Sequence, residues 1–416
     1  MKVLVVGKGG REHAIITALS ESPAGTELYS FPGSDAIFEL ARPFEAEGVA
    51  SLVAFMKKEG VDLCVAGEES YLVKDEGLAN ACEAAGIPCW GPPKEAARLE
   101  ASKEFAKEFM VRHAIPTGGY ATVDSIAEAR AAIAGKYPTV LKFDGLAAGK
   151  GVAVCPDEST ADEFLREVLV ERKFGEGRLL VEEFLEGPEI SIFASVVDGD
   201  YQILAPARDY KRIYDGDEGP NTGGMGAVSS LEMLDEELRG LIEDTVVRPT
   251  VEGLVRDGLP YRGFLYFGLM LTTDGPKLLE YNCRFGDPEA EAVLPMIGGD
   301  FARYLFEGAR GRLQPDLIRF ADGWSVCLVS ASAGYPAGSR SGDVISGLDQ
   351  VSDARVFHAG TRRNADGHFE TAGGRVLVVA AAGATREEAV ARVYAESDKV
   401  CFDGRQRRSD IGTRNF

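Results

Sequence analysis

Short apolar runs alternate with amphipathic segments in the first hundred residues. The runs predict buried strands, and they read MKVLVVG (1–7), TELYSF (26–31) and VDLCVAG (61–67). The segments between them have apolar residues at helical spacing. Strands that alternate with helices form a mostly parallel sheet covered on both faces. We therefore predict an N-terminal doubly wound α/β domain over residues 1–100.

A β-hairpin is predicted in residues 263–287. An apolar and aromatic strand is followed by an Asp-Gly turn and a return strand, Lys277–Cys283. Because strand side chains alternate between faces, we expect Glu280 and Asn282 to point one way, together with Arg284. Leu279, Tyr281 and Cys283 are then expected to enter the core.

The polar face of this hairpin has the chemistry of a metal site. A carboxylate oxygen beside an amide oxygen suits a hard cation such as Mg²⁺, which makes Glu280 and Asn282 the predicted ligands. Arg284 suits an oxyanion, because its fork of donors matches phosphate or carboxylate. The alternative interpretation is a solvated strand face.

A glycine-rich loop joins two predicted strands in residues 138–155. Lys142 lies on the first strand, and the loop contains Gly145, Gly149, Lys150 and Gly151. Glycines let backbone amides approach phosphate oxygens closely. The spacing is not that of a P-loop, because three residues instead of four separate the first Gly from Gly-Lys, and no Ser or Thr follows. The alternative is a plain flexible hairpin.

A second candidate anion site follows the first strand. Gly7-x-Gly9 lies in a turn before a helix predicted to begin at Glu12, with Gly10 and Arg11 at its N-terminus, and a helix N-terminus favours anions. The dinucleotide fingerprint fails, because Glu12 replaces its third glycine. A phosphate on a small substrate is one interpretation, and a tight turn that needs glycine is the other.

The remaining segments extend this pattern. Ser102 is a predicted N-cap for a helix over 102–113, and residues 206–230 are predicted to form a long polar loop. Residues 234–257 predict helix with Leu238, Leu241 and Ile242 inward. Residues 322–416 predict several strands, DVISG (343–347) among them, and one helix, so we expect a small β-rich domain there.

The composition and charge of the chain argue against some classes of function. The chain has 416 residues, a net charge of −21 and a pI near 4.8, which argues against a general nucleic-acid or anionic-membrane surface. Seven widely spaced cysteines without a CxxC motif are typical of a reduced, cytoplasmic protein. No apolar run approaches a membrane span. We expect small-molecule partners and a monomer or weak dimer.

Taken together, these segments resemble the phosphoribosylamine–glycine ligase (glycinamide ribonucleotide synthetase) family of the ATP-grasp superfamily. The matching stretches run in order along the chain and include GGREH (9–13), SKEFAKEF (102–109), KFDGLAAGKGV (142–152), VEEFLEGPE (181–189), GPNTGGMGA (219–227), EYNCRFGDPE (280–289) and DIG (410–412). The resemblance implies a reaction in purine synthesis. ATP phosphorylates the glycine carboxylate, and the amine of 5-phosphoribosylamine then attacks the glycyl phosphate. It also implies Mg²⁺ (or Mn²⁺) as cofactor and an ATP-grasp domain over 101–315, with a mobile lid lobe at 118–190 and a C-terminal domain at 322–416.

The resemblance further assigns site residues. Nucleotide positions carry over to Lys103, Lys142, Gly149, Lys150, Gly151, Glu182, Glu183, Leu185 and Glu189. Substrate positions carry over to Gly9, Gly10, Arg11, Glu69, Asp209, Lys211, Asn221, Thr222, Gly223 and Gly224. Lys142, Lys211 and Arg284 are the expected catalytic residues, because charge must be neutralised on a transferring phosphoryl group. Four positions depart from the family pattern, namely Lys8, Ser34, Glu68 and Tyr210.

Other functions remain as alternatives. The nearest is an ATP-grasp ligase for a different carboxylate and amine. A biotin-dependent carboxylase is disfavoured because no biotin attachment stretch is present. A dehydrogenase is disfavoured by the missing third glycine, and an inactive nucleotide-binding protein by the intact Glu280-x-Asn282-x-Arg284.

Overall fold

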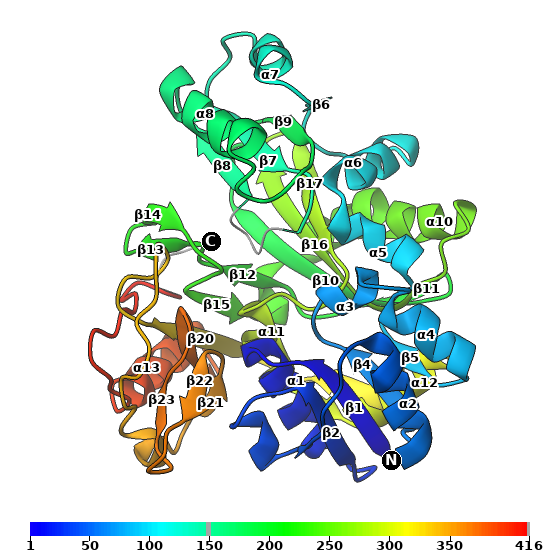
Figure 1. Cartoon of the computed structure of the whole chain (residues 1–416), viewed down its shortest axis with the longest axis vertical. Coiled ribbons are helices and arrows are strands. Elements are labelled where there is room, and N and C mark those ends of the chain that lie inside the picture. Colours follow the sequence, from blue (N-terminus) through cyan, green and yellow to red (C-terminus); the bar gives the residue numbers. More distant parts are fainter. Residues whose placement is uncertain (147–150, 414–416) are drawn as a thin grey trace.

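The computed structural model describes residues 1–146 and 151–413. Figure 1 shows an N-terminal α/β unit, an upper lobe that carries α7 and α8, and a long central sheet that continues into the C-terminal strands. The α/β multidomain class with an N-terminal doubly wound domain is confirmed.

The N-terminal unit is built on five parallel strands in the order β3-β2-β1-β4-β5. Their bounds are β1 Lys2–Gly7, β2 Glu27–Pro32, β3 Arg42–Pro43, β4 Leu63–Ala66 and β5 Cys89–Trp90, and the helices are α1 Gly10–Ser20, α2 Val49–Glu59, α3 Ser70–Val73, α4 Leu78–Ala85 and α5 Lys94–Ala101. The strand order reverses direction at β1 and β4. Open α/β sheets bind ligands at the carboxyl ends of strands at such a switch point. Arg11 and Glu69 follow those two ends.

The upper lobe has a four-stranded antiparallel sheet in the order β6-β9-β7-β8. Its elements are β6 Tyr120–Val123, α7 Ile126–Ile133, β7 Thr139–Phe143, β8 Val152–Cys155, α8 Glu158–Leu165 and β9 Leu179–Glu183. Its separate apolar core contains Leu141, Leu165 and Leu179. The helix before it, α6 Lys103–Arg112, starts at Ser102, whose hydroxyl accepts from the Phe105 amide as predicted. That the lobe moves stays a prediction.

The central sheet has nine strands. They follow the order β17-β16-β10-β12-β15-β20-β24-β21, with β11 paired to β10. Their bounds are β10 Glu189–Val197, β11 Asp200–Ile203, β12 Ala207–Asp209, β15 Gly226–Ser229, β16 Arg262–Thr272, β17 Gly275–Asn282, β20 Trp324–Ala331, β21 Arg355–His358 and β24 Arg375–Gly383. Helix α13, Arg386–Ser397, packs on β24 and β20. The C-terminal strands thus hydrogen-bond directly into the sheet that contains the hairpin.

The prediction of a long loop at 206–230 is wrong. The segment contains β12, β13 (Arg212–Tyr214), β14 (Glu218–Asn221) and β15, and Met225 to Ser230 are buried. Ladder pairing to β10 and β20 satisfies the backbone groups of a segment whose composition is polar and glycine-rich. The predicted strand DVISG is also wrong, because Val344 and Ser346 form only isolated bridges.

Two predicted core positions differ in the structure. A bulge in the hairpin pairs Gly268 with Glu280 but Leu269 with Leu278, so Leu279 lines a cavity and Leu278 enters the core. Leu241 is 42% exposed while Ile242 is buried, and a π-helix at Glu243–Val247 separates α9 (Glu236–Ile242) from α10 (Arg248–Arg256).

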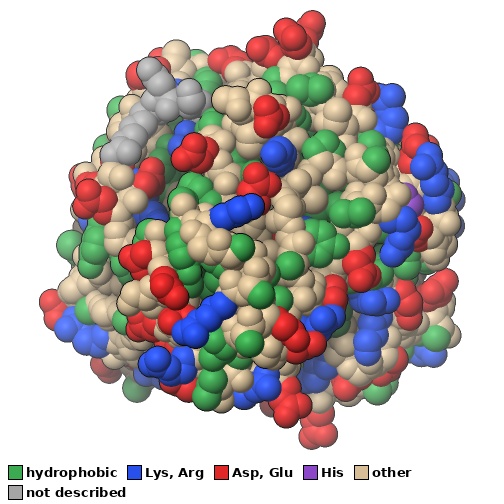
Figure 2. Space-filling model, turned by 90° about the horizontal axis from the view of Figure 1, so that it is seen from above, with side chains coloured by type: hydrophobic (Ala, Val, Ile, Leu, Met, Phe, Trp, Pro, Cys, Tyr) green, Lys and Arg blue, Asp and Glu red, His purple; other side chains and the backbone are tan. Residues whose placement is uncertain are grey.

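The surface is mixed in charge. Figure 2 shows acidic and basic side chains interspersed over the face seen from above. Among the described residues, no helix is long and apolar enough to cross a membrane.

Candidate active site

A cavity of about 320 Å³ lies where the N-terminal unit, the upper lobe and the central sheet meet. Twelve of the site residues predicted from the sequence line it, although they come from distant parts of the chain. These are Arg11, Glu69, Lys103, Gly151, Glu182, Asp209, Lys211, Thr222, Gly223, Glu280, Asn282 and Arg284. The described lining carries six basic and seven acidic side chains, so its charge is nearly balanced.

Glu182 on β9 holds two lysines at one edge of the cavity. Its Oε2 lies 2.9 Å from Lys107 Nζ and 3.1 Å from Lys142 Nζ, and all three side chains are less than 10% exposed. Burial would raise the pKa of Glu182, but the charges of Lys142 and Lys107 outweigh burial and lower it. Lys107 was not predicted, although it lies one turn after Lys103 on the same helix. Lys103 Nζ donates to the Gly145 carbonyl at 3.0 Å, and burial lowers the pKa of Lys103.

Arg284 lies between two carboxylates. Its Nε is 3.1 Å from Glu69 Oε2 and its Nη2 is 2.7 Å from Glu100 Oε1. Burial would raise the pKa of Glu69, but Arg284 and Arg11 hold that pKa at about 2. Burial raises the pKa of Glu100 to about 7, although Arg284 opposes the rise. Glu100, at the end of α5, was missed by the sequence analysis because nothing in a helical Glu signals a buried partner.

The hairpin presents the predicted metal ligands to the cavity. Glu280 and Asn282 both line it, two residues apart and on the same face of the strand. Hydrogen bonding assigns the Asn282 amide nitrogen toward Glu100 Oε1 (3.1 Å) and the Tyr281 carbonyl (3.2 Å), which leaves Oδ1 available as a ligand. Among the described residues, Glu280 makes no ion pair. The donor set therefore fits a hard divalent cation.

Lys211 lies between Asp209 and Glu189 at the side of the cavity formed by β12. Its Nζ is 2.8 Å from Asp209 Oδ1 and 2.5 Å from Glu189 Oε2. Burial lowers the pKa of Lys211, but Asp209 and Glu189 outweigh burial and raise it well above its ordinary value. Glu289, which accepts from Ser191 Oγ at 3.1 Å, lies nearby, and burial followed by the charge of Asp209 raises its pKa to about 7.

A glycine turn approaches the cavity next to an arginine from the C-terminal strands. Arg375 Nη1 donates to the Gly223 carbonyl (2.6 Å) and the Asp287 carbonyl (2.8 Å), and lies 3.0 Å from Asp287 Oδ1. Gly224 has φ +110°, and a Cβ there would lie 2.4 Å from Pro288 Cδ, so only glycine fits. No site residue in the C-terminal segment was predicted from the sequence. Arg375 belongs to that segment and lines the cavity, so the prediction was incomplete.

Several predicted residues lie apart from the cavity lining. Glu183 is exposed and accepts from the Gly119 amide, Leu185 is buried beside Gly118, and Asn221 is exposed on β14. Gly149 and Lys150 lie outside the described residues.

The predicted anion site at α1 is partly filled by the protein itself. The Gly9 amide donates to Glu12 Oε2 at 2.7 Å, and Arg11 Nε lies 2.6 Å from Glu12 Oε1. The Gly10 Cα faces Glu291, whose buried carboxylate has no hydrogen-bond partner among the described atoms. The helix N-terminus is therefore capped, and the basic residue that α1 contributes to the cavity lining is Arg11.

The four departures from the family pattern lie at different distances from the site. Tyr210 is buried, and its hydroxyl accepts from the Gly412 amide, so it faces the C-terminus. Ser34 Oγ accepts from the Ile37 amide, and Glu68 accepts from Ser70 Oγ. Lys8 is exposed. None of the four lines the described cavity.

Comparison with known proteins places the whole chain in one group. Three family models match successive parts of the chain. They are the phosphoribosylglycinamide synthetase N domain (residues 1–100), ATP-grasp (A) domain (101–290) and C domain (325–414). A phosphoribosylamine–glycine ligase of Caldanaerobacter subterraneus is 41% identical over 99% of each chain. One of Streptomyces coelicolor is 43% identical over 100% of this chain and 99% of its own.

Solved structures agree. The phosphoribosylamine–glycine ligase of Thermotoga maritima superposes with a TM-score of 0.86 at 35% identity, over 99% of this chain and 100% of that one. A biotin carboxylase domain of the Hydrogenobacter thermophilus 2-oxoglutarate carboxylase, solved with MgADP, has a TM-score of 0.73 at 20% identity, over 98% of this chain and 91% of that one. The second likeness shows a shared fold alone.

Proposed function

The chain belongs to the phosphoribosylglycinamide synthetase family, and from that premise we propose that it joins glycine to 5-phosphoribosylamine with ATP as the energy source. The products are glycinamide ribonucleotide, ADP and phosphate. The observation that carries the proposal is one cavity in which a hard-cation donor pair, a group of lysines and a tight glycine turn meet.

The nucleotide is proposed to lie between the upper lobe and the hairpin. Lys142 and Lys107, held by Glu182, supply fixed positive charge where phosphates would lie. Lys103 adds a third ammonium group at the start of α6. Prepositioned charges stabilise a transferring phosphoryl group without reorganisation in the transition state.

The fold implies a divalent cation, and we propose Mg²⁺ (or Mn²⁺) with Glu280 and Asn282 as its protein ligands. The near balance of charge in the described cavity supports this, because a triphosphate added there needs further cations. When bound, the ion neutralises phosphate charge and polarises the phosphoryl group. Arg284 does not compete with it for Glu280, because Glu69 and Glu100 hold the guanidinium.

Glycine is proposed to bind beside the Gly223–Gly224 turn. The close approach of this backbone leaves little room for a substrate side chain, and Arg375 and Lys211 offer positive charge to a carboxylate nearby. Phosphorylation of that carboxylate gives glycyl phosphate, which the amine attacks to release phosphate.

The amine substrate is proposed to lie at the carboxyl ends of β1 and β4, near Arg11 and Glu69. Arg11 can meet a phosphate, while Glu69, with its lowered pKa, remains a carboxylate that can accept from hydroxyl or amine groups. Because Arg11 Nε already pairs with Glu12, a phosphate would share this guanidinium with the protein.

The test is an ADP-release assay with glycine, alanine and β-alanine, each mixed with freshly made phosphoribosylamine. We expect glycine to dominate, because a site closed around hydrogen rejects a methyl group sterically. Release of ADP with a different acid or amine, and none with glycine, would assign the chain to another ATP-grasp ligase activity.

A further inference from the structure

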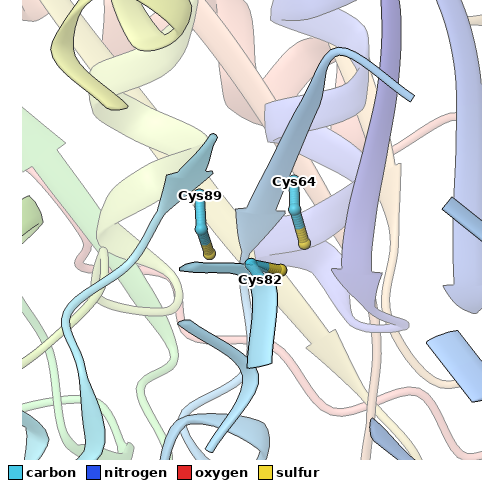
Figure 3. A group of neighbouring side chains, drawn as sticks. All are labelled: Cys64, Cys82 and Cys89. Atoms are coloured by element: carbon cyan, nitrogen blue, oxygen red, sulfur yellow. The ribbon is translucent and has the colours of Figure 1, made fainter. Parts of the chain in front are cut away.

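Three cysteines that the proposed function does not use converge in the N-terminal unit. Cys64 lies on β4, Cys82 on α4 and Cys89 on β5, and their Sγ atoms all lie within 4.8 Å of one another. Figure 3 shows the three side chains pointing toward a common point from two strands and one helix. All three are free thiols. In the sequence they are three of seven widely spaced cysteines without a CxxC motif, a pattern typical of a reduced protein with mostly buried thiols.

We propose that Cys64, Cys82 and Cys89 bind one soft, thiophilic metal ion of the Zn²⁺ or Cu⁺ class. Thiolate ligands select these ions. With metal–sulfur bonds of about 2.3 Å, three thiolates around one ion lie about 4 Å apart, so the observed spacing needs only small side-chain adjustment. A disulfide would use two of the sulfurs and leave the third without a role, whereas a metal ion uses all three.

The backbone already fixes these ligands. Cys64 and Cys89 are direct partners in the parallel β4–β5 ladder, so their side chains leave the same face of the sheet. Cys82 comes from α4, which packs against that face, and Cys64 and Cys82 are fully buried in the adjoining apolar core. A site preformed by folded elements loses little entropy on binding the ion.

The site also has an entry path. Cys89 is half-buried and lines a surface cavity of about 390 Å³, together with Glu83, the residue after Cys82. Among the described residues, no fourth His, Cys, Asp or Glu ligand joins the three thiols. Three-coordinate binding suits Cu⁺, and a water from the cavity can complete the tetrahedron that Zn²⁺ prefers.

The test uses the full chain, reduced with a phosphine, with excess Mg²⁺ present to occupy oxygen-ligand sites. Zn²⁺ and Cu⁺ are titrated in separate arms against a chromophoric chelator, and Cd²⁺ is added to a third sample to read thiolate charge-transfer absorption. We expect one tightly held ion per chain. Cys89→Ser and Cys82→Ser should weaken metal binding by more than about a hundredfold. Loss of a residue that only hydrogen-bonds a metal ligand typically weakens affinity by about 10- to 100-fold, and loss of the ligand itself should weaken it more. Cys401→Ser, at an exposed cysteine distant in sequence, is the matched control and should bind normally.

A second measurement does not depend on the folding of a variant. In the wild-type chain, the bound ion should slow alkylation of Cys89 by at least about tenfold, because the ion holds the thiolate that would react, and should leave Cys401 unchanged. Wild-type protein without charge-transfer absorption at one equivalent of Cd²⁺, or with equal alkylation rates of Cys89 in the presence and absence of ions, would overturn the proposal. Ligation of glycine should continue in every variant that folds, so failure here is separate from failure of the proposed function.

Discussion

Arg375 is the residue through which the C-terminal strands reach the cavity, and its removal gives a sharp prediction. Arg375→Ala deletes three contacts, to the carbonyls of Gly223 and Asp287 and to the Asp287 carboxylate. Hydrogen bonds that involve a charged group contribute about 1.5–3 kcal/mol each. If one of them is expressed in substrate binding, kcat/KM for glycine should fall by about 10- to 150-fold, at about 1.4 kcal/mol per factor of ten.

The assay is ADP release with glycine varied at saturating ATP and phosphoribosylamine. We expect KM for glycine to rise while KM for ATP changes by less than about threefold. Among the described residues, Lys107 and Lys142 pair with Glu182 and share no partner with Arg375, so the two groups should act independently. Arg362→Ala is the control, since Arg362 pairs with Glu370 on an exposed hairpin of the same C-terminal segment. An unchanged KM for glycine in Arg375→Ala would refute the assignment of the Gly223 turn to this substrate.

Three further predictions test other parts of the site. Glu280→Gln should lower turnover by at least about a hundredfold, as loss of a charge contact in the transition state does, and turnover within a few-fold of wild type would contradict the proposed metal ligand. Amide exchange at Gly145, Leu146 and Gly151 should slow when a non-hydrolysable ATP analogue binds, if the loop closes as a lid; unchanged exchange at saturating analogue would count against closure. Because burial raises the pKa of Glu100 from 4.5 to about 7, the folded state binds a proton that the unfolded state has lost in this window. We therefore expect the free energy of unfolding of the wild type, relative to that of Glu100→Gln, to fall as pH rises from about 4.5 to 7, as measured by chemical denaturation. A difference in free energy that does not change with pH would show that the pKa of Glu100 is not raised.

The hairpin shows how far sequence reasoning reaches. Two-residue alternation placed Glu280 and Asn282 on one face and Tyr281 in the core, and the structure agrees. The same reasoning misplaced Leu279, because a β-bulge adds one residue to a strand without any composition signal. Local patterns thus predict faces of a regular strand but not where its ladder is interrupted.

Long-range pairing explains the other differences. The segment 206–230 has the composition of a loop, yet its neighbours β10 and β20 make strands of its ends. Nothing in the sequence distinguishes Lys107, Glu100 and Arg375 from other polar residues. In the fold they pair with Glu182, Arg284 and Asp287, respectively. Tertiary context of this kind overrides local propensity and is absent from a single sequence.

The pairing of β15 with β20 determines what happens when the chain is divided into two polypeptides. Four residue pairs join β15 to β20, so the last hundred residues complete an otherwise open sheet edge by strand addition within one molecule. A polypeptide that stopped before β20 would expose β15 as a bare edge and would tend to associate with other copies. Supplied as a separate polypeptide, residues 322–416 have a complementary edge to offer, so the two pieces should reassemble into one enzyme.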